Sequence, residues 1–337
     1  MIKMPAEFEK QSFVQLIFPH KESDWIEYLE EARECFVNIA LNIAKFQSCL
    51  IICDDIEEVK SYFTNLENLY FIHYQSDDTW ARDCSALSVE KENSAQLIDF
   101  TFNGWGDKFE AKRDNNLTQN IKKIYASFVL EEPFILEGGS IESDGEGIIL
   151  TTTQCLLNPN RNSTYNKEAI EDKLSQTLGA KKILWLNHGT LEGDDTDAHI
   201  DTLARLVSND CIMYVECTDK KDSHYDALLK MKTELSRFKN LHNESYKLIA
   251  LPHPEAIYFE KERLPATYAN FLIINGAILV PTYSVKEDKK ALEIFKKTFP
   301  LRKIIPIDCS ILIRQHGSLH CVTMQFPKSV ILKSDTI

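Results

Sequence analysis

Hydrophobic and polar residues follow a pattern along the chain that recurs about five times. Each unit is expected to contain a strand hairpin, an amphipathic helix and a further short strand. The strands are expected at residues 12–18, 49–53, 87–89, 96–100, 133–136, 148–152, 182–186, 203–207, 211–216, 247–251, 271–274, 277–280, 303–307, 311–314 and 320–326. The helices are expected at residues 24–46, 115–127, 167–178, 225–238 and 287–299. The last two strands are expected to form a hairpin that closes on the start of the chain.

This repetition predicts an α/β protein built as a ring of like units. No linker rich in proline or serine divides the units, so one domain is expected over residues 1–337. In a closed ring, strand ends and turns from every unit converge on the central axis. Residues that are distant in the sequence can therefore share one site.

Composition narrows the class of partner. The net charge of −13 argues against nucleic acid and anionic membranes, and it attracts small cations. Nine cysteines at irregular spacings indicate reduced thiols rather than a disulfide framework. The first residues lack a secretion signal, and no apolar run is long enough to cross a membrane, so a cytoplasmic protein is expected.

The stretch 193–201 carries the strongest chemical signal. If residues 195–201 are extended, Asp195, Asp197, His199 and Asp201 share one face of the strand. Burying several carboxylates requires a cation to meet them. That cation is a metal, a basic side chain or a cationic substrate; the plain alternative is an acidic turn solvated at the surface.

A metal is the weaker choice for this stretch. A calcium loop that starts at Asp195 requires glycine at its sixth position, which is Ile200. A transition-metal site made of His199, Asp201 and the distant Cys321 remains open, but no closely spaced pair of histidines or cysteines supports it.

Polar residues also stand at the other expected turns. Taken singly, Trp80 can fill the core, Asp83 can pair with Arg82, Glu137 can be a solvated strand end, and Cys321 can be a small buried residue. Their placement at equivalent points of successive units favours one shared site.

These motifs resemble the agmatine deiminase family, within the guanidine-modifying superfamily that also holds bacterial-type peptidylarginine deiminases. The resemblance runs nearly end to end and rests on the order and number of its motifs. They are Met4-Pro5-Ala6-Glu7-Phe8-Glu9, Phe18-Pro19-His20 with Trp25, Trp80-Ala81-Arg82-Asp83, Phe102-Asn103-Gly104-Trp105-Gly106, Glu137-Gly138-Gly139, 193–201, Tyr268-Ala269-Asn270-Phe271 and His320-Cys321-Val322-Thr323.

The resemblance implies a five-fold pseudosymmetric α/β propeller (pentein) of ββαβ units. Two departures from the family pattern bear on the site. The family usually has glycine where this chain has Ala198, and three glycines where it has Gln315, His316 and Gly317. Ala198 is expected to be tolerated unless its backbone needs a positive φ. Gln315 and His316 are expected to change the shape of the pocket mouth.

The resemblance also implies roles for single residues. Cys321 is the expected nucleophile and His199 the expected acid and base, while Asp83 and Asp201 grip the guanidinium. Glu137 is expected to orient His199. The expected substrate-binding residues are Trp80, Asp83, Asp201, Asp195 and Trp105. No metal and no organic cofactor is expected.

The expected substrate is the small cationic guanidine agmatine, hydrolysed to N-carbamoylputrescine and ammonia in polyamine and putrescine biosynthesis. Peptidyl-arginine or another guanidine is the alternative substrate. Two further classes stay open: a metal-dependent hydrolase and a non-catalytic binder of cationic amines. The sequence leaves the oligomeric state open, a homo-oligomer included.

Overall fold

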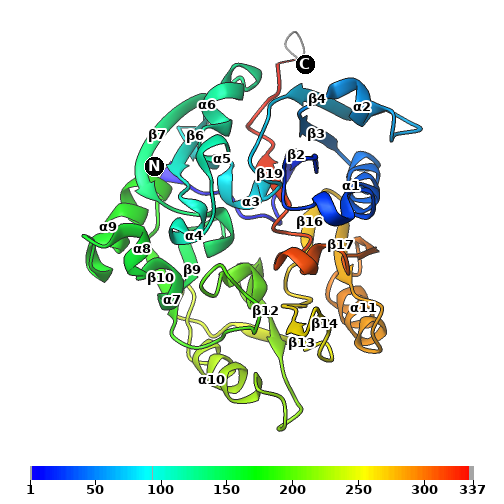
Figure 1. The fold of residues 1–337 in the computed structure, drawn as a ribbon. Helices are drawn as coiled ribbons and strands as arrows, with labels where there is room; N and C mark the ends of the chain where they lie inside the picture. Colours follow the sequence, from blue (N-terminus) through cyan, green and yellow to red (C-terminus); the bar gives the residue numbers. More distant parts are fainter. Residues whose placement is uncertain (1, 93, 334–337) are drawn as a thin grey trace.

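The computed structural model describes residues 2–92 and 94–333, which form a mixed α/β fold. Within these residues, five sheets of three or four strands share one pairing pattern, and a separate hairpin joins β14 to β15. In each of the five sheets, an antiparallel pair of strands is followed by a parallel pair. Figure 1 shows the sheets arranged in chain order around a central region.

The strands of the sheets, in spatial order, are as follows. Two sheets have four strands each: β19 (Thr323–Pro327), β2 (Gln11–Ile17), β3 (Ser48–Cys53) and β4 (Leu69–His73) in one, and β1 (Ile2–Lys3), β5 (Leu87–Lys91), β6 (Ser94–Thr101) and β7 (Phe128–Ile135) in the other. Three sheets have three strands each: β10 (Lys182–Leu186), β9 (Ile148–Thr152) and β8 (Ile141–Ser143); β11 (Ala204–Ser208), β12 (Cys211–Glu216) and β13 (Lys247–Pro252); and β16 (Leu272–Ile274), β17 (Ala277–Thr282) and β18 (Lys303–Asp308). The separate hairpin pairs β14 (Tyr258–Phe259) with β15 (Glu262–Arg263).

Four longer helices lie at the periphery of the ribbon in Figure 1 and cover the sheets: α1 (Leu29–Ala44), α9 (Lys167–Leu178), α10 (Tyr225–Leu235) and α11 (Glu287–Thr298). Each buries one apolar stripe, as Ile170, Leu174 and Leu178 do in α9. The side chain of Asn166 caps the start of α9, and Gly179, at φ 75°, ends it.

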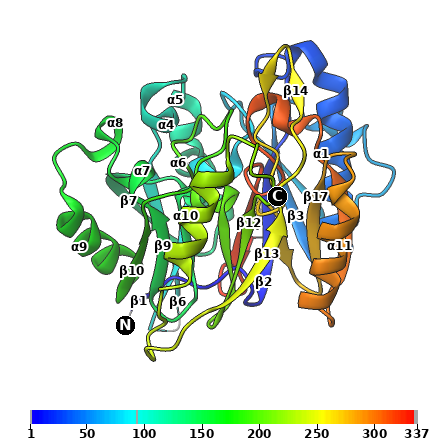
Figure 2. The ribbon, with the colours of Figure 1, turned by 90° about the horizontal axis from the view of Figure 1, so that it is seen from below.

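The remaining helices are short and lie in the connections. They are η1 (Ile26–Tyr28), α2 (Ile56–Lys60), α3 (Ala81–Cys84), α4 (Gly104–Asp107), α5 (Lys112–Asn115), α6 (Leu117–Ile121), η2 (Lys122–Ile124), η3 (Gly138–Ser140), α7 (Thr153–Leu156), α8 (Pro159–Asn162), η4 (Ile200–Thr202) and η5 (Leu312–Gln315). Figure 2 shows α4, α5 and the β14 hairpin at one end of the sheets, whereas the N-terminus lies at the opposite end.

Most of the predicted elements are confirmed within a few residues, and the last strand does pair with the first strand of its sheet, β19 with β2. The continuous helix over 115–127 is wrong. Asn116 leaves helical geometry because its side chain bonds to the carbonyl of Lys112, and Tyr125 turns to an extended conformation so that its hydroxyl donates to buried Gln15. One local side-chain hydrogen bond and one tertiary hydrogen bond override helix propensity here.

The predicted strand over 311–314 is also wrong, and with it the final hairpin. Leu312 and Ile313 are adjacent and both fully buried, which the alternating faces of a half-exposed strand do not allow. They lie in η5, whose last turn ends at His316, at φ 64°. No helix among the described residues is long and apolar enough to cross a membrane.

Candidate active site

A cavity of about 820 Å³ lies beside α4, α5 and the end of η5. Five of the eight residues expected to act in catalysis or substrate binding line it: Trp80, Asp83, Trp105, Asp195 and Cys321. The other three, Glu137, His199 and Asp201, are fully buried and do not line the cavity. The cavity is therefore bounded by residues from widely separated parts of the chain.

Cys321 lies just before β19 and its side chain is almost fully buried. The amide Nδ2 of Asn270 donates to Sγ at 3.2 Å, and Oδ2 of Asp201 lies 3.9 Å from the same sulfur. Burial, followed by the charges of Asp201 and Asp83, raises the pKa of the Cys321 thiol well above its ordinary value. As long as no cationic ligand is bound in the cavity, the Cys321 thiol is therefore protonated.

Two carboxylates lie close to this thiol, and each is held by fixed donors. Asp83 accepts hydrogen bonds from the backbone N–H of Gly139 and from Nε1 of Trp105, both at 2.9 Å. Asp201 accepts from Nδ1 of His320 at 2.8 Å through Oδ2. Its Oδ1 is buried and has no hydrogen-bond partner among the described residues. This oxygen is available to a donor that enters the site.

Gly139 marks the point where Asp83, His199 and Asp201 meet. A Cβ atom at Gly139 would lie 2.7 Å from His199 Nδ1, 2.9 Å from Asp83 Oδ1 and 3.1 Å from Asp201 Oδ2. The structure thus brings these three residues together, and the absence of a side chain at position 139 permits their approach.

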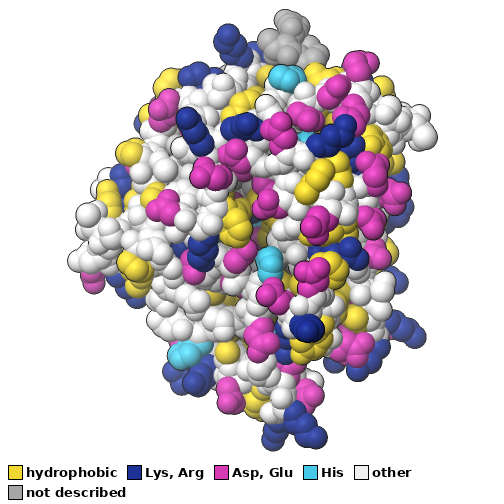
Figure 3. Space-filling model, in the orientation of Figure 1, with side chains coloured by type: hydrophobic (Ala, Val, Ile, Leu, Met, Phe, Trp, Pro, Cys, Tyr) yellow, Lys and Arg dark blue, Asp and Glu magenta, His cyan; other side chains and the backbone are white. Residues whose placement is uncertain are grey.

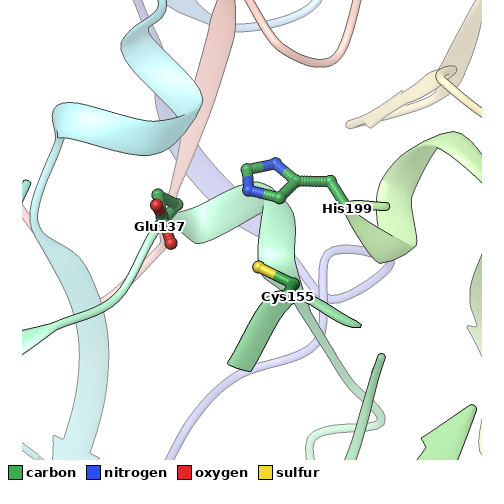
Figure 4. Close-up of side chains that lie close together, drawn as sticks. All are labelled: Glu137, Cys155 and His199. Atoms are coloured by element: carbon green, nitrogen blue, oxygen red, sulfur yellow. The ribbon is translucent and has the colours of Figure 1, made fainter. Parts of the chain in front are cut away.

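His199 lies beside Glu137 and Cys155, and Figure 4 shows its ring and the Cys155 sulfur pointing toward Glu137. The nearest carboxylate oxygen in an ion pair is Oδ1 of Asp83, 3.7 Å from Nδ1. Burial lowers the pKa of His199, but the charges of Asp83, Cys155 and Glu137 outweigh it and raise this pKa well above the ordinary value. The imidazole is thereby held protonated.

Glu137, which was expected to orient His199, lies beside its ring and is itself held by Arg161. Its two carboxylate oxygens accept from Nε of Arg161 at 2.8 and 3.1 Å. Arg161 also donates to Asp197 Oδ2 at 2.8 Å and to the carbonyl of Thr196 at 2.9 Å. Arg161 therefore ties the Glu137 turn to the loop that carries His199.

Residues 195–201 are not extended, so the shared face considered for Asp195, Asp197, His199 and Asp201 does not form. Asp197 and Ala198 have φ values of 67° and 62°, and both oxygens of Asp194 accept hydrogen bonds from within this turn. The left-handed turn separates the acidic residues, because Asp197 pairs with Arg161 and Lys108 while Asp195 lines the cavity. Ala198 does occupy a conformation with positive φ, where glycine carries no steric cost.

Acidic residues dominate one wall of the cavity, and Figure 3 shows acidic side chains near the centre of this face of the molecule. Burial and neighbouring carboxylates raise the pKa of Asp78 to about 7, that of Asp114 to about 8 and that of Asp195 to about 6. Asp78 accepts from Nε1 of Trp80 at 2.8 Å. This wall suits a ligand with a cationic end.

The residues that replace the family's glycines lie at the cavity mouth. Nδ1 of His316 donates to the carbonyl of Gly193 at 2.7 Å, and Gln315 donates to the backbone carbonyl of Asp24 at 2.7 Å. Gln315 also donates to the hydroxyl of Tyr28. These bonds tie the segment before Cys321 to two neighbouring loops.

Sequence reasoning missed several contributors to the site. Cys155, Arg161 and Asp114 lie outside the quoted motifs, so no sequence signal marked them. Asn270 and His320 lie inside quoted motifs, yet their spacing alone gave them no role. Only the fold reveals that Asn270 donates to the sulfur of Cys321 and that His320 contacts Asp201.

The metal site considered for His199, Asp201 and Cys321 is not among the ligand clusters of the described residues. His199 instead clusters with Glu137 and Cys155, with ligand atoms within 4.8 Å of one another. The guanidinium of Arg161 already meets the Glu137 carboxylate there. A cationic side chain thus occupies the place where a metal would pair with Glu137.

Comparison with known proteins finds relatives that match nearly the whole of this chain. A structure provisionally named a peptidyl-arginine deiminase is 47% identical, with a TM-score of 0.94 and coverage of 97% of this chain and 99% of that one. A cysteine-to-serine variant of C. jejuni agmatine deiminase, solved with substrate bound, is 40% identical, with a TM-score of 0.91 and coverage of 97% of both chains. A Marinomonas protein provisionally named an agmatine deiminase is 32% identical over 98% of this chain and 96% of its own length.

The sequence model of the Porphyromonas-type peptidyl-arginine deiminase family matches residues 3–327. This match covers all of the expected site residues and extends from the N-terminal motif to the end of β19. The resemblance noted in the sequence is confirmed, and the chain belongs to the Porphyromonas-type peptidyl-arginine deiminase family.

Proposed function

We propose that this protein is an agmatine deiminase, which hydrolyses agmatine to N-carbamoylputrescine and ammonia. The observation that carries this proposal is the acidic cavity that ends at Cys321, together with the similarity to C. jejuni agmatine deiminase. Agmatine carries a guanidinium at one end and an ammonium at the other. The two buried carboxylates suit the first group, and the acidic wall suits the second. A role in polyamine synthesis follows from the product.

The first half of the reaction forms a covalent intermediate. The guanidinium donates hydrogen bonds to Asp83 and to the free Oδ1 of Asp201, which neutralises the charges that hold the Cys321 thiol protonated. The Cys321 thiol gives up its proton to solvent as agmatine binds, and Sγ then attacks the guanidinium carbon as a thiolate. The carbon–nitrogen bond of the leaving group breaks as protonated His199 supplies a proton, and ammonia departs.

The second half releases the product. His199, now neutral, takes a proton from a water molecule that attacks the same carbon. The carbon–sulfur bond breaks, the sulfur of Cys321 regains a proton from the hydroxyl of the intermediate, and the neutral ureido product leaves. Trp80 packs so closely against Gly317 that a Cβ there would lie 2.0 Å from its ring, and this contact fixes one wall beside the reacting carbon.

Residues 1–337 act as a single domain in this proposal, and the fold is a five-fold α/β propeller. The support for the propeller is the pairing pattern shared by the five sheets and the pairing of β19 with β2. In such a ring, Cys321, His199 and Asp83 come from different units, which fits their common position beside Gly139 and Asp201.

The test of the proposal is a comparison of substrates. Agmatine, free arginine and a peptide with an internal arginine are each incubated with the protein, and ureido product is measured. Agmatine is expected to be the preferred substrate. Preference for the peptide would support a peptidyl-arginine deiminase instead.

The residues at the cavity mouth give a first prediction about substrate specificity. Replacing His316 by glycine removes the hydrogen bond from its side chain to the carbonyl of Gly193. It also removes a side chain from a backbone position at φ 64°, a conformation that side chains disfavour. We expect the kcat/KM ratio of bulky guanidines to agmatine to rise about threefold to tenfold. Parallel assays of the arginine peptide and agmatine measure this ratio. Lys261→Gly, at φ 73° in the β14–β15 turn, is the control and should leave the ratio unchanged.

The acidic wall predicts a pH dependence of binding. Because the pKa values of Asp78 and Asp114 are raised to about 7 and 8, these carboxyls are neutral below those values and anionic above them. The KM for agmatine should therefore fall about threefold to tenfold as the pH rises from about 6 to about 8. Steady-state kinetics across this range measure the effect. Asp78→Asn should flatten the profile, and an unchanged profile in that variant would contradict this assignment.

A further inference from the structure

No hydrogen bond fixes the ring of His199 among the described residues. Both ring nitrogens are buried and without a hydrogen-bond partner there, and Nδ1 lies 3.7 Å from Asp83 Oδ1, which is longer than a hydrogen bond. The orientation of the ring therefore depends on packing and on the backbone that carries His199. That backbone leaves the acidic turn, which we define as residues 194–198.

The acidic turn adopts a conformation that most side chains disfavour. Asp197 and Ala198 have φ values of 67° and 62°, directly before His199. Within the turn, Asp194 Oδ2 accepts from the backbone N–H of Ala198 at 2.6 Å. From outside it, Oγ1 of Thr152 donates to the carbonyl of Ala198 at 2.8 Å. A backbone in this region persists because the surrounding contacts determine it.

Two cations grip the side chain of Asp197 and the backbone of the same turn. Nζ of Lys108, from α4, lies 2.9 Å from Oδ1 of Asp197, and Nη1 of Arg161, from α8, lies 2.8 Å from Oδ2. Lys108 also donates to the backbone carbonyl of Asp195, and Nη2 of Arg161 donates to that of Thr196 at 2.9 Å. We call this set of charge-assisted bonds the Asp197 clamp.

The clamp is anchored in two neighbouring parts of the fold. The side chain of Arg161 is fully buried, and its Nε donates to Glu137 at 2.8 Å. Lys108 belongs to the α4 loop, whose Trp105 donates to Asp83 at 2.9 Å. The clamp therefore ties the acidic turn to the segments that hold the two carboxylates beside the imidazole.

From this geometry we propose that Asp197 is a positioning residue, whose clamped carboxylate fixes the acidic turn and thereby holds the imidazole of His199 beside Asp83. Asp197 does not line the cavity, so it acts through His199 and not on the substrate. The consequence for turnover rests on the proposed function. The place of the imidazole does not, and it can be measured without any substrate.

The substitution Asp197→Asn tests this directly, because asparagine keeps the size and tolerates a positive φ but carries no charge. We expect crystal structures of the wild-type protein and the variant to show the imidazole of His199 displaced by about 1 Å or more. The kcat for agmatine should fall about 10-fold to 100-fold, since misplacement of a reacting group on this scale has such an effect. Agmatine affinity, compared in the Cys321→Ser background, should stay within about threefold, because solvent screens a charge outside the cavity.

Asp107→Asn is the matched control. Asp107 has φ 62° and stands next to Lys108, but it is exposed and does not line the cavity, so kcat should be unchanged. Lys108→Met is the second variant, which removes one cation of the clamp. It should lower kcat about threefold in the wild-type background and have no further effect in Asp197→Asn, because both residues act through one contact. Should Asp197→Asn fail to fold, the crystal structure and kcat of Lys108→Met decide the test.

Each outcome decides the proposal. An imidazole in its wild-type place overturns it, and so does a displaced imidazole with unchanged kcat. A parallel loss of agmatine affinity and kcat overturns it as well, because a general loosening of the fold produces that result. A displaced imidazole combined with no turnover of agmatine by the wild-type protein would support the role of Asp197 while refuting the proposed substrate. A displaced imidazole with lower kcat and retained affinity would support both.

Discussion

Cys321→Ser is expected to abolish formation of ureido product from agmatine, with a loss of about 10⁴-fold or more. The serine hydroxyl is far harder to ionise than a thiol, so the neutralising effect of the bound guanidinium no longer produces a nucleophile. Asn270 remains able to donate to the new side chain, because its Nδ2 lies 3.2 Å from the present sulfur. The fold and the binding of agmatine should therefore survive.

Three measurements define this experiment: product formation, the melting temperature and agmatine affinity by calorimetry. Cys211→Ser is the control, since Cys211 is also buried but lies at the start of β12, away from the cavity. That variant should retain activity. Substantial turnover by Cys321→Ser would refute the covalent mechanism.

Asp83→Asn should weaken agmatine binding by about 100-fold or more, which corresponds to the loss of a charge-assisted bidentate contact. Both oxygens of Asp83 accept hydrogen bonds, from Gly139 and from Trp105. An asparagine must turn its NH₂ toward one of these donors, so the variant loses the charge and also disturbs the orientation of the side chain.

Agmatine affinity measured in the Cys321→Ser background isolates binding from turnover. Asp99→Asn is the matched control, because Asp99 is another buried aspartate whose partner, Gln119, lies outside the cavity. The control should bind agmatine normally. Equal affinity in Asp83→Asn and the control would show that Asp83 does not grip the guanidinium.

The regular elements could be predicted because their signals are local. The strand 182–186 and the helix 167–178 agree with the structure residue for residue, since apolar periodicity, an Asn cap and a terminal glycine all lie within the segment. The end of the helix expected at 115–127 could not be predicted in the same way, because the group that ends it is a partner from elsewhere in the fold. Its residue Tyr125 bonds to Gln15, which is 110 positions away.

Part of the candidate site could likewise be predicted from the sequence, and part could not. Cys321, His199, Asp83 and Asp201 could be chosen from motif chemistry, and the structure brings them together around Gly139. The arrangement of the acidic stretch 193–201 could not be predicted from the sequence, because it depends on a left-handed turn at 197–198.

The groups that hold these residues in place were beyond prediction for a different reason. Arg161 is distant in sequence from Glu137 and Asp197, and nothing in its spacing signals that it joins them. The same holds for the contact between Glu7 and His320, which spans 313 positions.

The most direct test of the function is the substrate comparison with purified wild-type protein, read by the ureido product and by released ammonia. Agmatine should yield one ureido group and one ammonia per molecule, at a kcat/KM well above those for free arginine and the arginine peptide. Turnover of the peptide with none of agmatine, or no ureido product from agmatine, would contradict the assignment of this protein as an agmatine deiminase.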